Sequence, residues 1–234
     1  MTATNTVNRD RRLNRFQVAL CAAILASTSS AAPLAASTSL PPTPLTSPSS
    51  SSPSASPAPP SGPNSLAVWP EGASSPTFDL LDTNGTPRTL RDYRGQIVVI
   101  FFGFMHCPDA CPAGLFKLAQ VTKQLGQGAV RVQVLFITLD PERDTPASLK
   151  RYVSAFNPRF VGLTGTSAQV DQAATNFNVQ YARVPSGNDY TIDHSTGIFV
   201  FDGSGHLRLV GSAQSPVDAF VHDLTALAAE PPGR

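Results

Sequence analysis

The chain has 234 residues, with 17 lysines and arginines, 16 aspartates and glutamates, and a formal net charge of +1. Four of the arginines and one of the aspartates precede residue 37, which leaves 13 basic and 15 acidic residues in the remainder. That remainder has no basic excess of the kind that a nucleic-acid-binding surface requires, so nucleic acid is set aside as a partner.

The first 36 residues have the organisation of a signal peptide or an N-terminal membrane anchor. A basic segment over 8–15 precedes an apolar run over 16–26, and Leu34-Ala35-Ala36 forms an imperfect cleavage site. The run is shorter than the roughly 20 apolar residues that a membrane span needs, which favours a secretory signal over an uncleaved anchor. We therefore expect an exported protein.

Residues 37–65 consist almost entirely of serine, proline, threonine and alanine. Such a segment buries too little apolar surface to offset its ordering entropy, so a disordered linker is predicted. It is interpreted as a spacer that holds a domain away from a membrane, the alternative being low-complexity sequence without a role. The remaining residues, 66–234, have the length and apolar content of one domain.

Strands and helices alternate in the first half of this domain. Asn84-Gly85 predicts a hairpin turn. The continuous apolar run over 96–104 predicts a strand buried on both faces of a sheet. A helix is expected over 109–126, then a buried strand over 130–140 and a helix over 145–156. This order implies parallel strands joined by right-handed crossovers.

The second half continues with shorter elements. A strand is expected near 160–165, a helix over 167–177 and an extended segment over 179–184. A hairpin follows over 196–211, turning at 202–205, and Pro216 opens the last helix. The predicted fold class is α/β, with a central mixed sheet flanked by helices, an N-terminal hairpin and an inserted hairpin.

Cys107 and Cys111 lie where the first buried strand passes into the following helix. Residues four apart share one helix face, with Cβ atoms about 5–6 Å apart. Modest distortion would allow either a disulfide between them or joint coordination of one metal ion. The helix N-terminus should also lower the pKa of the thiols and favour thiolate.

Three roles are therefore open for this cysteine pair: disulfide exchange, metal binding and structural cross-linking. Cross-linking is the weakest, because a bridge that closes so short a loop restrains little of the unfolded chain.

A metal site would need further ligands, which the four histidines could supply. Neighbouring side chains diverge, so His106 is not expected to bind together with Cys107. His206 and His222 are expected on the surface. His194 precedes a buried strand, and position alone leaves it equally a structural residue or a ligand. Two thiolates and one imidazole form a soft donor set that suits copper, whereas structural zinc would want a fourth protein ligand.

Four segments carry a family resemblance. The sequences FFGFMHCPDACP, LDPERDTP, YVSAFNPRFVGLTG and DYTIDHS resemble, in order and approximate spacing, those of the Sco/SenC family. The family's members are membrane-tethered, thioredoxin-like copper proteins that help to assemble the binuclear copper centre of cytochrome c oxidase. The resemblance runs from Phe78 to the C-terminal helix. It implies a thioredoxin-like fold. It also implies that the protein binds copper, as Cu(I), Cu(II) or both.

Carried over by position, the resemblance implies that Cys107, Cys111 and His194 are the copper ligands. Asp140 and Asp193 are then expected to support those ligands or to contact a partner. The alternative, purely structural roles are that Asp140 caps the next helix and that Asp193 ends a strand. Met105 stands where the family usually has threonine, and we expect it to fill the core rather than to touch copper.

The resemblance implies a metallochaperone that delivers copper to a cytochrome c oxidase or helps to mature its binuclear copper centre. The implied partners are the copper-bearing oxidase subunit, a thiol reductant and a further copper chaperone. The implied location is the bacterial periplasm, either attached to the inner membrane or released after signal cleavage.

The alternative is a thiol–disulfide oxidoreductase that reduces the oxidase's copper subunit or another exported protein, with Cys107 attacking and Cys111 resolving. Exchangers of the thioredoxin type place a proline opposite their cysteines. His194 occupies the corresponding region here and Pro185 comes too early, which favours copper. A thiol peroxidase would need an activating arginine and threonine, and the sequence offers no convincing set.

Overall fold

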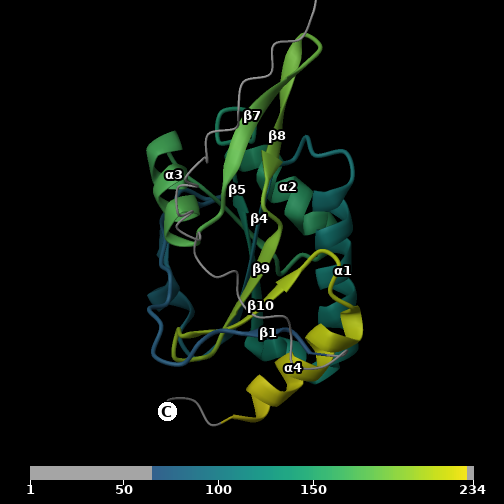
Figure 1. Cartoon of the computed structure of the whole chain (residues 1–234). Helices are drawn as coiled ribbons and strands as arrows, with labels where there is room; N and C mark the ends of the chain where they lie inside the picture. The colour runs from purple at the N-terminus through teal and green to yellow at the C-terminus, as the bar shows by residue number, and fades with distance from the viewer. Residues whose placement is uncertain (1–64, 231–234) are drawn as a thin grey trace, which may run out of the picture. The chain divides into compact units, whose positions relative to one another are not determined.

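A computed structural model describes residues 65–230 (Figure 1). The predicted leader over 1–36 and all but the last residue of the predicted linker over 37–65 lie outside the described residues. Among the helices within 65–230, none combines the length and the apolar character that a membrane crossing requires.

Eight strands form one mixed sheet in the order β1-β10-β9-β4-β5-β6-β2-β3. β4 pairs in parallel with β5, and β5 with β6, whereas β9 and β2 join this parallel centre as antiparallel strands. The predicted central mixed sheet is therefore confirmed. The strands of the sheet are β1 (Ala67–Val68), β2 (Asp79–Asp82), β3 (Pro87–Thr89), β4 (Ile97–Gly103), β5 (Val132–Thr138), β6 (Val161–Thr164), β9 (Gly197–Phe201) and β10 (Leu207–Ser212).

Local capping signals mark the start of two of the four α-helices and the end of another. The Thr145 hydroxyl caps one helix by accepting the Ser148 N–H, and Thr166 forms a capping box with Gln169 at another. Gly126 ends the first with φ +54°, a backbone conformation that disfavours other residues. The helices are α1 (Ala110–Leu125), α2 (Pro146–Phe156), α3 (Ser167–Asn176) and α4 (Val217–Ala229), and 3-10 turns occupy Leu90–Tyr93 and Gly126–Arg131.

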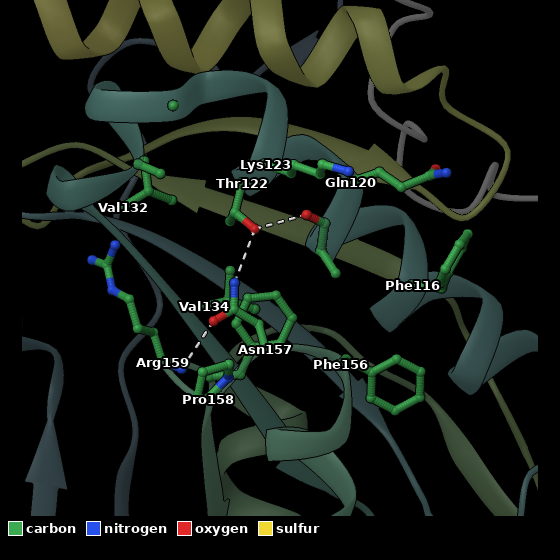
Figure 2. Close-up of a pocket in the computed structure, with 14 residues that line it drawn as sticks. Phe116, Gln120, Thr122, Lys123, Val132, Val134, Phe156, Asn157, Pro158 and Arg159 are labelled. Carbon is green, nitrogen blue, oxygen red and sulfur yellow. Dashed lines mark hydrogen bonds between the residues drawn. The ribbon is translucent and has the colours of Figure 1, made fainter.

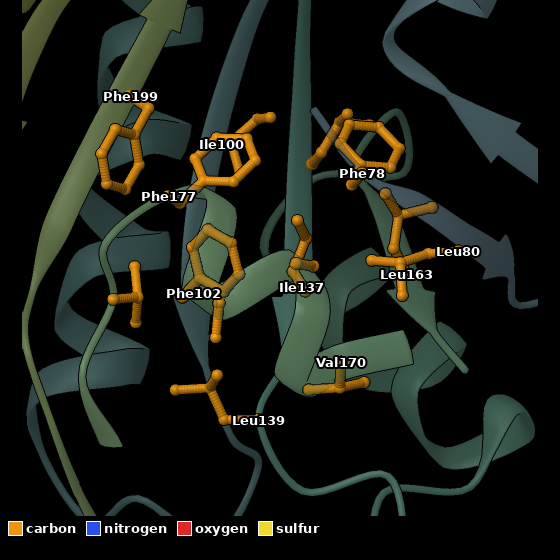
Figure 3. Packing of buried hydrophobic residues seen from close by; sticks show 14 of the residues in the cluster. Phe78, Leu80, Ile100, Phe102, Ile137, Leu139, Leu163, Val170, Phe177 and Phe199 are labelled. Carbon is orange, nitrogen blue, oxygen red and sulfur yellow. The ribbon is translucent and has the colours of Figure 1, made fainter. Parts of the chain in front are cut away.

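The two faces of the sheet bury separate hydrophobic clusters, because successive side chains of a strand point to opposite sides. In β4, Phe102 packs on the α3 side, whereas Phe101 packs on the side of α1, α2 and α4. Figure 3 shows the first cluster, where the ring of Phe102 lies 5.2 Å from that of Phe177 and 6.1 Å from that of Phe199. Every residue of β4 is buried, as its continuous apolar sequence predicts.

A second sheet is formed by β7 (Tyr181–Ser186) and β8 (Asp189–His194), which pair only with each other. This hairpin lies between α3 and β9 in the chain (Figure 1). Its first strand begins within the extended segment predicted over 179–184, but no strand was predicted over Asp189–His194, and the hairpin predicted over 196–211 is β9–β10. The predicted N-terminal hairpin is β2–β3, which turns through Asn84 and Gly85. The structure therefore confirms the expected order of elements, except for β1 and β8, for which no strand was predicted.

Candidate metal centre

The cysteine pair lies at the edge of the sheet where β4 and β5 both end. Gly103 and Thr138, the last residues of these parallel strands, are paired in register, so the loops that follow them are neighbours. Cys107 is half-buried in the first loop, and Cys111 is buried in the first turn of α1. The Cys111 N–H donates to Cys107 Sγ at 3.4 Å, and both thiols are free.

Cys111 is packed directly against the end of β4. A Cβ atom on Gly103 would lie 2.7 Å from Cys111 Sγ and 2.9 Å from the Phe136 ring. Those distances are shorter than any relaxed contact, so the sulfur takes this position because residue 103 is a glycine.

His194, at the end of β8, meets Cys111 although 83 residues separate them, with Nε2 lying 3.8 Å from Sγ. His194 Nδ1 is 3.0 Å from the Ser195 carbonyl oxygen, which can only accept, so Nδ1 carries the proton. The lone pair of Nε2 is then directed toward the sulfur. A tetrahedral ion with ordinary bond lengths would separate such a sulfur and nitrogen by about 3.5 Å.

Cys107 does not complete this set in the structure. Within residues 65–230, the only group of three possible ligand atoms lying within 4.8 Å of one another belongs to His106, Asp140 and Asp144. Cys107 Sγ is therefore not within that distance of both Cys111 Sγ and His194 Nε2. The structure brings together two of the three predicted ligands and places the third beside them.

The pKa of the Cys111 thiol is raised, so the predicted lowering by the helix N-terminus is wrong for this residue. Burial is the main cause, because it disfavours the thiolate, and it outweighs a backbone contact with Phe104 that favours the thiolate. The Tyr152 hydroxyl is buried without a hydrogen-bond partner among the described residues. Burial raises the pKa of this tyrosine, and the negative charges of Cys111 and Cys107 raise that pKa further. A cation bound beside Cys111 would favour the thiolate form of this buried cysteine.

Asp144 anchors the cysteine loop, a role that the sequence analysis missed. Its fully buried carboxylate accepts the Met105 N–H at 3.0 Å and the Thr138 hydroxyl at 2.6 Å. The other carboxylate oxygen lies 3.6 Å from His106 Nδ1. Burial raises the pKa of Asp144. The available signal was a second aspartate, four residues after Asp140, in the segment LDPERDTP.

Asp140 is fully buried beside the same loop, so its carboxylate is not presented to a partner. It accepts the Tyr190 hydroxyl at 2.8 Å and pairs with Arg143. These contacts connect the end of β5 to the β7–β8 hairpin.

Asp193 is exposed and Met105 is half-buried, whereas Asp140 is fully buried. Asp193 is exposed, and neighbours along a strand point to opposite faces, so the carbonyl of Ser195, and not the carboxylate of Asp193, holds the His194 ring. Its place beside His194, in a shallow hollow of about 420 Å³, keeps Asp193 a candidate for partner contact. Met105 packs against the hydrophobic cluster on the α1 side, as core filling requires.

A larger hollow, of about 630 Å³, lies between α1 and the end of α2 (Figure 2). Phe116 and Phe156 line it, with Lys123 and Arg159 as its charged residues. Neither cysteine of the pair nor His194 belongs to its lining, so it is separate from the candidate metal centre.

The unequal burial of the two thiols predicts ordered chemical modification. With limiting iodoacetamide at pH 8, Cys107 should be carbamidomethylated before Cys111, because Cys111 has no exposed surface and its pKa is raised by burial. Peptide mapping by mass spectrometry would check this. First modification of Cys111 would contradict the arrangement.

Comparison with known proteins places the chain in a family. A family model described as SCO1/SenC matches residues 70–229. The mitochondrial SCO2 homologue of Bos taurus is 48% identical over 132 residues, which are 55% of this chain and 50% of the relative. The chain thus spans about half the length of this curated relative.

Two solved structures are also similar. Bradyrhizobium japonicum ScoI with copper bound is 36% identical, with a TM-score of 0.61, covering 66% of this chain and 99% of that one. Yeast Sco1 with copper bound is 35% identical, with a TM-score of 0.58, covering 66% and 90%. Both neighbours bind copper, and their fold supports the predicted thioredoxin-like class. From the match over residues 70–229, this chain belongs to the SCO1/SenC family.

Proposed function

We propose that this chain is a copper metallochaperone that delivers copper to a cytochrome c oxidase or helps to mature its binuclear copper centre. The observation that carries the proposal is the 3.8 Å approach of His194 Nε2 to Cys111 Sγ beside a second thiol. Thiolate and imidazole are donors that copper accepts in both of its common oxidation states. The copper bound by the two neighbours supports the same cargo.

The donors differ in what each would do for the ion. Cys111 and His194 are already close, and His194 has the tautomer that leaves Nε2 free to bind. Cys107, which is half-buried in a loop, would complete the set by rotation of its side chain. Both cysteines must be reduced, because a disulfide between them would remove the two thiolates. Three protein ligands would leave room for a donor from the receiving protein.

The partners follow from this role. The receiving protein would be the copper-bearing subunit of the oxidase, a thiol reductant would keep Cys107 and Cys111 reduced, and a further chaperone would supply copper. Residues 1–36 would direct export to the bacterial periplasm and, if retained, would tether the domain to the inner membrane.

A second candidate function is thiol–disulfide exchange. The contrast between half-buried Cys107 and buried Cys111 favours it, because an exchanger needs an accessible attacking thiol and a protected resolving thiol. Its substrate would be a disulfide in the oxidase's copper subunit or in another exported protein.

A deletion strain would test both functions through its oxidase activity. If the chain delivers copper, activity should fall and added copper should restore it. If the chain reduces the oxidase, an added small thiol should restore activity and copper should not. A plasmid-borne chain with Cys107→Ser and Cys111→Ser should fail to complement, whereas the wild type should succeed. Full complementation by the double variant would overturn both functions.

A further inference from the structure

The hairpin that carries His194 has no backbone pairing with the main sheet. β7 and β8 form a separate two-stranded sheet that extends away from the body of the domain (Figure 1). An isolated two-stranded hairpin is marginally stable in water. His194 is also joined to the main sheet by the two residues that separate it from β9, so its position depends on this connection and on side-chain contacts between the hairpin and the body.

Tyr190 and His194 lie on the same face of β8. Along this strand Tyr190, Ile192 and His194 are half-buried or buried, whereas Asp189 and Asp193 are exposed. Ile192, between them, is 5% exposed and belongs to the core cluster on the α3 side. Four residues of strand place Tyr190 and His194 about 13 Å apart, so a shift at the first is carried to the second by the strand.

The loop after β5 holds Tyr190 at three points. Its hydroxyl donates to Asp140 Oδ1 at 2.8 Å, and its carbonyl accepts from the Arg143 guanidinium at 2.8 Å. The Arg143 guanidinium also lies 3.6 Å from the centroid of the Tyr190 ring. Arg143 is itself fixed by its ion pair with Asp140, which is fully buried. A hydrogen bond to a buried charged acceptor is among the stronger ones in a protein.

Two further ion pairs between this loop and the hairpin are more exposed. Arg143 lies 3.1 Å from Asp189, whose side chain is 65% exposed. Arg183 of β7 lies 2.7 Å from Glu142, but their side chains are 42% and 55% exposed. Exposed pairs contribute little because water competes for both charges. The contacts of Tyr190 with fully buried Asp140 and with Arg143 are therefore the strongest polar contacts of the hairpin with the body, and they add to the packing of Ile192 in the core.

We propose that Tyr190 is the positioning residue for His194, and that Asp140, Arg143 and Tyr190 form a latch that keeps His194 beside Cys111. This inference rests on the proposed function, because it assigns the latch to copper retention. Opening the latch lets the hairpin move away from the body and removes the imidazole from the ion. Copper release is then controlled from a point about 13 Å from the ligand.

The test is Tyr190→Phe in the full chain, which removes the hydroxyl and keeps the ring. Two quantities would be measured: amide hydrogen exchange without metal, and the rate of Cu(I) transfer to a chromophoric chelator. We expect the β7–β8 amides to exchange about tenfold faster, with β4 and β5 unchanged, and copper to leave about tenfold faster. Tyr93→Phe is the matched control, since the Tyr93 hydroxyl is buried and has no hydrogen-bond partner among the described residues.

A double variant separates positioning from general destabilisation. If Tyr190 acts through His194, Tyr190→Phe should not accelerate copper release further in a His194→Ala background. An equal acceleration in both backgrounds would overturn the positioning role. Arg143→Lys, which keeps a cation but loses the planar stacking, should accelerate exchange and release in the same direction as Tyr190→Phe.

The outcomes for the two proposals are distinguishable. If Tyr190→Phe and Arg143→Lys both match the wild type in hairpin exchange and in copper release, the latch is overturned and copper binding stands. If the wild type binds no copper, the proposed function fails. Unchanged hairpin exchange in the metal-free variants would then overturn the latch as well, whereas faster exchange would confirm its mechanical part.

Discussion

Replacing His194 with alanine should lower the affinity of the chain for Cu(I) by at least about a hundredfold. Changes to groups that only orient a metal ligand commonly cost 10–100-fold in affinity, so loss of a ligand should reach or exceed that range. The remaining thiols, Cys107 and Cys111, can still hold Cu(I) as a pair, which is why residual binding is expected. A competition titration with a chromophoric Cu(I) chelator, under reducing conditions, measures the change.

The matched control is His206→Ala. His206 lies in the β9–β10 turn, its side chain is 65% exposed, and its one ionic neighbour is Asp202 at 3.8 Å. Its removal should leave copper affinity unchanged. In the Cu(II) form, the wild type should also show thiolate-to-copper absorption that is altered in His194→Ala. Equal copper affinity for the wild type and His194→Ala would refute the three-ligand model.

Replacing Asp144 with alanine should lower the free energy of unfolding by about 3 kcal/mol. Two buried donors, the Met105 N–H and the Thr138 hydroxyl, would lose their acceptor, at about 1–3 kcal/mol each. Removing a buried carboxylate recovers part of its desolvation cost, so the effect should be smaller than the upper sum. For a domain of this size the melting temperature should fall by roughly 6–12 °C, which calorimetry would detect.

The Asp144 effect should also depend on pH. Burial raises the pKa of this carboxyl above its ordinary 3.8, so the folded protein holds the proton more tightly than the unfolded chain does. The stabilisation from that proton is complete below pH 3.8 and is lost as the pH rises through the raised pKa. Asp144→Asn cannot ionise, so it should not lose this stabilisation. The difference in free energy of unfolding between the variant and the wild type should therefore shift in favour of the variant as the pH rises from 3.5 to 7, which urea unfolding would measure.

Asp79→Ala serves as the control for both Asp144 variants, because Asp79 is an exposed carboxylate on β2. Surface substitutions of this kind usually change stability by less than about 0.5 kcal/mol. If Asp144→Ala unfolds at the same temperature as Asp79→Ala, the assigned hydrogen bonds of Asp144 do not anchor the cysteine loop.

The secondary structure could be predicted from the sequence because its causes are local. The apolar run that becomes β4 indicates burial on both faces, and the residues of β4 are all buried. Thr145 and Gly126 mark helix ends through a hydroxyl and through a positive φ that belong to those residues themselves. The four motif segments were also enough to indicate the SCO1/SenC family, through their order and approximate spacing, and the family match over residues 70–229 confirms it.

The geometry of the candidate site and the pKa values of its groups could not be predicted in the same way, because they depend on residues that are distant in the sequence. Sequence alone determined the α/β architecture, the family and the three candidate ligands. Only the tertiary structure decided that His194 lies 3.8 Å from Cys111, because that contact joins elements 83 residues apart. It also decided that Cys111 is buried, so desolvation raises its pKa against the expected effect of the helix N-terminus. It also decided that Asp144, and not the equally buried Asp140, accepts the Met105 N–H, because position in space, rather than residue type or burial, selects a hydrogen-bond partner.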